Sequence, residues 1–237
     1  MSVPASDRDL RAIRSFVIRG GRLSPAQQRA LEQLWAHYGI DWQPDQPLDW
    51  TTCFGRTAPV VLEIGFGMGE SLVTMAQNAP ECDFVGVEVH PPGIGNLLQR
   101  IEQERLGNLR LLRGDVMAML HAGVMPEGSL TRVQIYFPDP WPKKRHHKRR
   151  LVQAALLDLL HRVVRPQGQL HIATDWQPYA EAMLLSLEQA SGRRNLAADG
   201  GFVPRPPWRP VTKFERRGER LGHGVWDLLF ERSDRDG

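Results

Sequence analysis

The segment between positions 133 and 150 contains one carboxylate and one indole, and a dense run of cations follows them directly. The segment reads Val-Gln-Ile-Tyr-Phe-Pro-Asp-Pro-Trp-Pro-Lys-Lys-Arg-His-His-Lys-Arg-Arg, with Asp139 and Trp141 in its proline-rich middle. Its apolar start predicts a buried strand, and the prolines predict a stiff loop directly after that strand. A carboxylate fixed beside a cationic strip indicates chemistry on a polyanion.

The basic charge of the chain is concentrated in this strip. Six of the eight residues from Lys143 to Arg150 are Lys or Arg, whereas the whole chain has 30 basic and 27 acidic residues. The remainder therefore carries 24 basic and 27 acidic residues, a net charge of −3. A charge run is commonly a solvated face, but its position at a strand end beside Trp141 favours phosphate binding.

The composition is that of a globular protein, with 41% hydrophobic and 24% charged residues in 237. We expect an N-terminal basic arm, helix and linker over 1–57 and one main domain over 58–237. Five arginines between positions 8 and 22 form either an arm that orders on an anionic partner or a frayed terminus. No stretch resembles a secretory signal or reaches the ~20 apolar residues of a membrane span, so we expect a soluble cytoplasmic protein.

No metal site is expected. Cys53 and Cys82 are too few for a zinc site or a disulfide framework, and His146 and His147 have no partner at metal-ligand spacing.

Short apolar runs without alternation indicate strands that are buried on both faces of a parallel sheet. These runs cover 59–64, 84–87, 109–112, 133–137 and 170–174. Helical periodicity covers 72–78, 151–164 and 178–190, and a helix capped by Ser24 is expected to end at Gly39. The alternation predicts an α/β fold with a doubly wound, mostly parallel sheet whose ligands bind beyond the carboxyl ends of the strands. Residues 211–215 and 225–230 flank a Gly-rich turn and predict an antiparallel C-terminal hairpin.

A glycine-rich turn follows the first strand of the main domain. Gly65, Gly67 and Gly69 allow the backbone to approach a ligand closely, although tight packing alone would also explain them. Glu88, at the end of the second strand and 19 residues after Gly69, favours a nucleoside because a carboxylate can accept both ribose hydroxyls.

The acidic residues around this turn distinguish between cofactors. Glu63 and Glu70 would repel a pyrophosphate, whereas a cofactor with a sulfonium and an amino group would not be repelled. Asp115, after the third strand, is placed to accept a hydrogen bond from an adenine amine. The pattern therefore favours S-adenosylmethionine over NAD.

Five motifs in the same order carry a family resemblance. They are Leu62-Glu-Ile-Gly-Phe-Gly-Met-Gly69, Gly86-Val-Glu-Val-His90, Phe137-Pro-Asp-Pro-Trp-Pro-Lys143, Ala173-Thr-Asp-Trp-Gln-Pro-Tyr179 and Thr212-Lys-Phe-Glu215. Together they make the chain similar to the bacterial tRNA (guanine-N7-)-methyltransferases. The resemblance implies a seven-stranded class I methyltransferase sheet with helices on both faces, S-adenosylmethionine as methyl donor, and a guanine in the variable loop of tRNA as target.

The resemblance also implies roles for individual residues. Cofactor contacts fall on Glu63, Glu88, Asp115 and Asp139, together with the three glycines of the turn. Substrate contacts fall on Lys143, Asp175, Thr212, Lys213, Phe214 and Glu215. RNA-binding positions fall on Arg145, His146, His147, Lys148, Arg149 and Arg150. The partner would be tRNA, with no membrane and no metal, and we expect a monomer or a weak homodimer.

The chemistry sets the role expected of Asp139. Guanine N7 has a lone pair and no proton, so its methylation requires alignment with the methyl–sulfur axis rather than a general base. We therefore interpret Asp139 as the catalytic residue that orients the base by accepting hydrogen bonds from N1–H and the exocyclic amine; a cap of the Pro-Asp-Pro turn is the alternative.

Trp141 either stacks on a base or packs in the core. Lys148 to Arg150 are expected to open a helix, where cations oppose the helix dipole.

Three other functions fit the sequence less well. A non-catalytic RNA-binding module would not need the glycines and carboxylates of the cofactor motif. A methyltransferase of proteins or small molecules is disfavoured by the basic strip. An N6-adenine RNA methyltransferase would carry an Asn/Asp-Pro-Pro-aromatic loop, which the segment 138–141 matches only in part.

Overall fold

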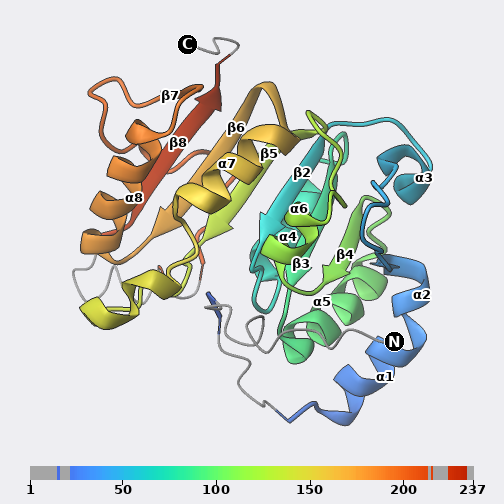
Figure 1. Ribbon diagram of the computed structural model, residues 1–237. Coiled ribbons are helices and arrows are strands. Elements are labelled where there is room, and N and C mark those ends of the chain that lie inside the picture. The colour runs from blue at the N-terminus through green and yellow to red at the C-terminus, as the bar shows by residue number, and fades with distance from the viewer. Residues whose placement is uncertain (1–14, 17–21, 213–214, 216–223, 234–237) are drawn as a thin grey trace, which may run out of the picture.

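A single mixed sheet organises the computed structural model, which describes residues 15–16, 22–212, 215 and 224–233. Its strands lie in the order β1-β4-β3-β2-β5-β6-β8-β7 (Figure 1). The parallel strands are β1 (Gly39–Ile40), β2 (Val60–Ile64), β3 (Asp83–Glu88), β4 (Leu109–Arg113), β5 (Leu130–Tyr136) and β6 (Val164–Thr174). The predicted doubly wound, mostly parallel sheet is thus confirmed, with β1 at its edge as a strand that the sequence did not indicate.

Helices cover both faces of the sheet (Figure 1). One apolar cluster joins the sheet to α6 (Val116–His121), α7 (Ala154–Val163) and α8 (Gln177–Gln189). The other joins it to α1 (Pro25–Gln33), α4 (Glu70–Asn78) and α5 (Pro91–Glu104). Alternation along β2 divides its side chains between the two clusters, with Leu62 and Ile64 on one face and Val61 on the other.

The N-terminal helix begins as expected and ends early. Ser24 Oγ accepts a hydrogen bond from Gln27 N at 3.2 Å, and Gln27 Oε1 accepts one from Ser24 N at 2.9 Å, which is a capping box. The helix stops at Gln33, and a separate turn, α2 (Trp35–Tyr38), leads into β1. The linker expected before residue 58 contains a helix, α3 (Trp50–Phe54), which ends at the left-handed Gly55.

The C-terminal strands are antiparallel, as expected, but the expected pairing partner of the last strand is wrong. The antiparallel partners of β8 (Trp226–Arg232) are β6 and β7 (Arg193–Asn195), not residues 211–215. Of that segment, Val211 and Thr212 are irregular and Glu215 is helical, whereas Lys213 and Phe214 lie outside the described residues. Pairing with β6 lets β8 bury Leu228 and Phe230 in the core.

The basic strip does not open an α-helix. Residues Lys144–Arg149 form a short 3-10 helix, η2, and α7 starts only at Ala154. The side-chain amide of Gln153, the residue that caps α7, donates to the carbonyl oxygens of Lys148 and Arg150 and so separates the two helices. The expected opposition between these cations and a helix dipole therefore does not exist. Within the described part of the chain, no helix combines the length and apolarity that crossing a membrane requires.

Candidate active site

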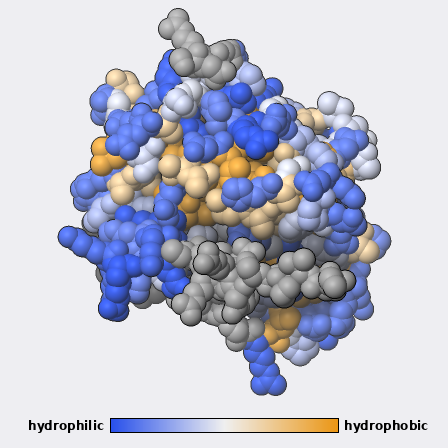
Figure 2. Space-filling view, in the orientation of Figure 1, coloured by the Kyte–Doolittle hydropathy of each residue, from blue (hydrophilic) through white to orange (hydrophobic). Residues whose placement is uncertain are grey.

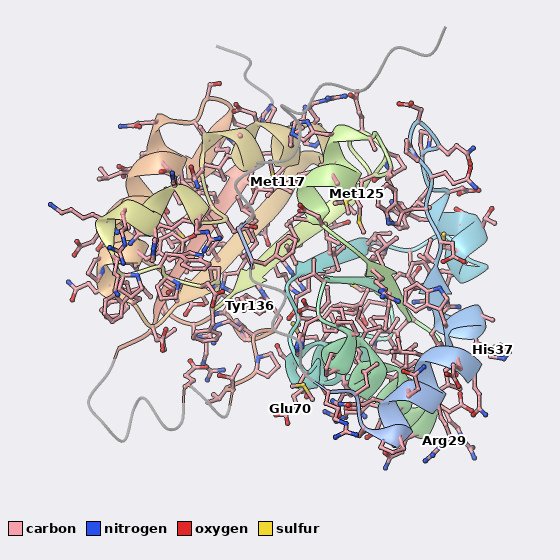
Figure 3. All side chains as sticks on the ribbon, turned by 60° about the horizontal axis from the view of Figure 1, so that its bottom comes forward. Arg29, His37, Glu70, Met117, Met125 and Tyr136 are labelled. Atoms are coloured by element: carbon pink, nitrogen blue, oxygen red, sulfur yellow. The ribbon has the colours of Figure 1, made fainter. Side chains whose placement is uncertain are left out.

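A cleft of about 240 Å³ opens at the carboxyl ends of the central parallel strands. It is lined by Gly65 after β2, Glu88 at the end of β3, Asp115 after β4, and Tyr136 and Asp139 at and after the end of β5. Tyr136 lies near the middle of the molecule (Figure 3). The structure therefore brings together side chains from four successive strand ends, which is where ligands bind in doubly wound folds.

The glycine turn is held in place by Glu88. Gly65, Gly67 and Gly69 all have left-handed φ values, of 75°, 58° and 77°. The Glu88 carboxylate accepts hydrogen bonds from the backbone N–H groups of Gly67 at 2.9 Å, Val89 at 2.7 Å and His90 at 3.0 Å. A carboxylate has about four acceptor sites, so Glu88 both shapes the turn and retains capacity for a ligand hydroxyl.

Glu63 is the unusual carboxylate of this region. It lies within β2, is 2% exposed and does not line the cleft, although the two following residues, Ile64 and Gly65, do. Its Oε2 atom is buried without a hydrogen-bond partner among the described residues. Burial, followed by the nearby charge of Glu88, raises the pKa of Glu63 to about 8. The carboxyl group is therefore mostly neutral at pH 7 in the free protein, and a cationic ligand nearby would favour its ionised form.

Asp115 lines the cleft just after β4. It is the N-cap of α6, where its Oδ1 accepts a hydrogen bond from Met117 N at 3.0 Å. The side chain is half-buried and lines the cleft. Capping fixes its orientation, so that the carboxylate is held ready for a donor such as an exocyclic amine.

The loop that carries Asp139 is bent at both ends. Phe137 and Trp141 have φ values of 51° and 44°, a region that residues with a Cβ rarely occupy and that costs energy to maintain. Phe137 N donates to Ala173 O at 2.8 Å, and Arg150 Nε donates to Pro140 O at 2.9 Å. These bonds hold a strained loop whose tip, Asp139, is exposed at the cleft.

Trp141 is half-buried and packed by its neighbours. Its indole N–H donates to Ser15 O at 3.3 Å, and the guanidinium of Arg149 lies over its ring at 4.7 Å from the centroid. His146 meets it edge-on at 5.8 Å. Of the two roles expected for this indole, these contacts favour packing.

The basic strip divides by exposure, and Figure 2 shows a hydrophilic patch on the part of this face that lies over η2. Lys143, Lys144, Arg145 and Lys148 are exposed, whereas His146, His147 and Arg149 are half-buried. Desolvation, followed by the surrounding cations, lowers the pKa of His146. Arg150 differs from the others: it is 8% exposed and stacks over Tyr179 at 4.5 Å from the ring centroid.

The residues expected to bind substrate also differ in their exposure to solvent. Asp175 is exposed directly after β6, and Thr212 is half-buried. Glu215 is 4% exposed and is engaged by the buried Arg209, whereas Lys213 and Phe214 lie outside the described residues. Trp176, which is 40% exposed beside Asp175, was not singled out from the sequence, although a tryptophan next to a strand-end acid was a usable signal.

No group of three His, Cys, Asp or Glu side chains is arranged to hold a metal ion among the residues that the structure describes.

The sheet order, with carboxylates after three successive parallel strands, defines the fold class as that of the class I methyltransferases. A family model described as a putative methyltransferase matches residues 57–228. Among solved structures, the 16S rRNA methyltransferase KamB superposes with a TM-score of 0.57 at 15% identity, covering 83% of this chain and 99% of that one. The 16S rRNA (adenine(1408)-N(1))-methyltransferase from Catenulisporales acidiphilia gives a TM-score of 0.55 at 19% identity, covering 84% and 95%. These identities are too low to show more than a shared fold.

Sequence relatives are far more similar. A tRNA (guanine-N(7)-)-methyltransferase of Shewanella oneidensis is 56% identical over 223 residues, which are 94% of this chain and 93% of that protein. One of Alcanivorax borkumensis is 53% identical over 229 residues, which are 97% of this chain and 95% of that protein. The chain therefore belongs to the tRNA (guanine-N(7)-)-methyltransferase family.

Proposed function

We propose that this chain transfers a methyl group from S-adenosylmethionine to N7 of a guanine in the variable loop of tRNA. The observation that carries the proposal is sequence identity above 50% to tRNA (guanine-N(7)-)-methyltransferases over more than nine tenths of the chain. We place the activity in the cytoplasm and assign it to a monomer or a weak homodimer. We also keep the division into an N-terminal part, 1–57, and a main domain, 58–237.

The cleft fits S-adenosylmethionine better than a dinucleotide. Bound there, S-adenosylmethionine would supply an activated methyl group on a sulfonium. Glu88 would accept a hydrogen bond from a ribose hydroxyl, and Asp115 would accept one from the adenine amine. The buried carboxyl group of Glu63 is neutral in the free protein, and a cation bound beside the glycine turn would favour its ionised form, whereas a pyrophosphate would not.

Asp139 is the residue that would orient the guanine. It is exposed at the cleft, so it can accept hydrogen bonds from the N1–H and the exocyclic amine of a base brought in from solvent. The strained loop and its hydrogen bonds to Ala173 and Arg150 preorganise this carboxylate. Because N7 needs no deprotonation, holding the base in line with the methyl group is the main contribution that the protein makes.

The exposed cations supply the contact to the tRNA backbone. Lys143, Lys144, Arg145 and Lys148 are exposed within one short segment and would neutralise phosphates. Arg150, which is buried and bonded to Pro140 O, would support the loop rather than bind RNA.

Two further polar side chains and one aromatic side chain would contact the target base and the neighbouring nucleotides. Asp175 and Thr212 are within reach of solvent at the substrate side. Trp176 offers an indole on which an unstacked base can lie, an interaction typical of single-stranded RNA recognition.

The experiment is methyl transfer from labelled S-adenosylmethionine to unmodified tRNA, followed by mapping of the product. Methylation at N7 labilises the glycosidic bond, so reduction and aniline treatment cleave the chain at the modified nucleotide. The proposal expects one cleavage, in the variable loop. Label without cleavage would indicate a different target atom, such as adenine N6, and binding without label would indicate a non-catalytic RNA-binding module.

A further inference from the structure

A fully buried arginine stands behind the substrate side of the cleft. Arg209 is 1% exposed and forms two forked ion pairs. Its Nη1 and Nη2 donate to the two oxygens of Glu215 at 2.7 Å each, and its Nε and Nη2 donate to the two oxygens of Asp227 at 2.7 and 2.9 Å. Burying such a group is costly unless every donor is satisfied, and here one guanidinium satisfies two buried carboxylates.

Glu215 ties this arginine to the segment expected to bind substrate. Thr212 N donates to Glu215 Oε2 at 3.2 Å, and Glu215 N donates to Thr212 Oγ1 at 3.1 Å. The Glu215 carboxylate therefore already accepts three hydrogen bonds and is 4% exposed. It is placed to fix Thr212 rather than to contact a base.

Asp227 ties the same arginine to the floor of the cleft. Asp227 Oδ1 lies 2.8 Å from His171 Nε2, and His171 Nδ1 lies 2.9 Å from the hydroxyl of the cleft residue Tyr136. Trp208 Nε1, which can only donate, is 3.2 Å from His171 Nδ1. Nδ1 is consequently an acceptor, and the proton of a neutral imidazole is on Nε2, facing Asp227.

A third contact reaches the Asp139 loop. The guanidinium carbon of Arg209 lies 5.8 Å from the centroid of the Phe137 ring, at the start of that loop. Phe137 has a left-handed backbone, and this contact of its side chain adds to the hydrogen bond from Phe137 N to Ala173 O at that end of the loop. Arg209 thus contacts both Glu215, which binds Thr212, and Phe137, which begins the Asp139 loop.

We propose that Arg209 is a positioning residue for methyl transfer: by binding Glu215 and Asp227 together, it holds Thr212 and the Asp139 loop in the arrangement that receives the guanine. The inference rests on the function proposed above and adds a role for residues that do not touch the reacting atoms. Arginine is required because lysine carries a single ammonium and cannot form two forks at once. Charge balance supports the arrangement, because burial lowers the pKa of His171 and keeps it neutral between the pair and Tyr136.

The test compares Arg209→Lys and Glu215→Gln with the wild type in kcat and KM for tRNA and in the Kd for S-adenosylmethionine. Arg56→Lys is the matched control, because Arg56 also pairs with a buried carboxylate, Asp83, at the opposite end of the sheet. We expect both test variants to lose about 10- to 100-fold in kcat/KM for tRNA, the scale of a misplaced substrate group. Their affinity for S-adenosylmethionine should remain that of the wild type. A general loss of folding would instead lower both kcat/KM for tRNA and the affinity for S-adenosylmethionine.

The outcomes are separable. If Arg209→Lys does not fold, Glu215→Gln decides, because it keeps the fork on Asp227 and the shape of the acceptor. Test variants as active as Arg56→Lys, or losses that run in parallel with S-adenosylmethionine binding, would overturn the inference while leaving the proposed function intact. A wild type that binds S-adenosylmethionine and methylates no tRNA would overturn both.

Discussion

Replacing Glu63 by Gln should change how the stability of this protein depends on pH. The Glu63 side chain is 2% exposed, and burial and the neighbouring Glu88 raise its pKa from 4.5 to about 8. Gln has nearly the same shape and stays neutral at every pH. The substitution therefore removes the titration and leaves the packing of β2 almost unchanged.

The sign follows from proton counting. Between pH 4.5 and about 8 the native state binds one more proton at Glu63 than the unfolded state does, so stability falls as the pH rises. The stabilising contribution of the neutral acid is complete below pH 4.5 and is lost as the pH passes through about 8. The slope is about 1.4 kcal/mol per pH unit, which amounts to ~2 kcal/mol between pH 6 and 7.5.

Urea unfolding, followed by intrinsic fluorescence at pH 6, 6.75 and 7.5, measures this slope. The expected result, in the absence of ligand, is that Glu63→Gln gains about 2 kcal/mol on the wild type across this range. Glu188→Gln, on the exposed side of α8, is the control and should run parallel to the wild type. Parallel profiles for Glu63→Gln and the wild type would show that Glu63 is charged in the native state and would refute the reasoning.

Three further predictions concern the substrate. Asp139→Asn should lower kcat about 100-fold while the Kd for tRNA stays the same, because the base is held less well in line; equal effects on both constants would indicate a role in loop structure alone. Replacing Lys144, Arg145 and Lys148 by Ala together should flatten the logarithmic dependence of tRNA affinity on salt by roughly two to three units, and an unchanged slope would exclude these cations as phosphate contacts. Trp176→Ala should weaken tRNA binding by ~1–3 kcal/mol and Trp176→Phe by less, measured by fluorescence anisotropy; equal affinities for Ala, Phe and the wild type would rule out stacking.

Much of the fold is readable from local patterns. The apolar runs predict the buried parts of β2 to β6, whereas the largely exposed, polar start of β6, which begins at Val164, six residues before the predicted run, gives no such signal. The strand ends also predict the cleft, since Glu88, Asp115 and Asp139 follow parallel strands and must meet at one edge. These features depend only on short stretches of chain.

Features that depend on distant partners were not predictable. The pairing of β8 with β7 joins segments about 30 residues apart, and a Gly-rich turn nearer in sequence offered a more local but wrong partner, 211–215. Nothing in the sequence distinguishes Arg150 from Arg149, yet Arg150 is buried because it packs over Tyr179 and donates to the Pro140 carbonyl.

The buried polar network around Arg209 also depends on residues that are distant in sequence and was therefore not predictable. Arg209, His171 and Asp227 come from three separate segments and carry no periodic signal that would single them out. Only the assembled sheet brings their side chains together. The motif Thr212 to Glu215 likewise does not reveal that Arg209 binds the Glu215 carboxylate.

The most direct test of the account is the identity of the atom that receives the methyl group. A tRNA made with 7-deazaguanine at the variable-loop target keeps the Watson–Crick edge of the base and replaces N7 by a carbon that has no lone pair. The account predicts that this tRNA binds and competes with normal tRNA but accepts no labelled methyl at that nucleotide. Undiminished methylation of the 7-deaza tRNA would contradict transfer to guanine N7.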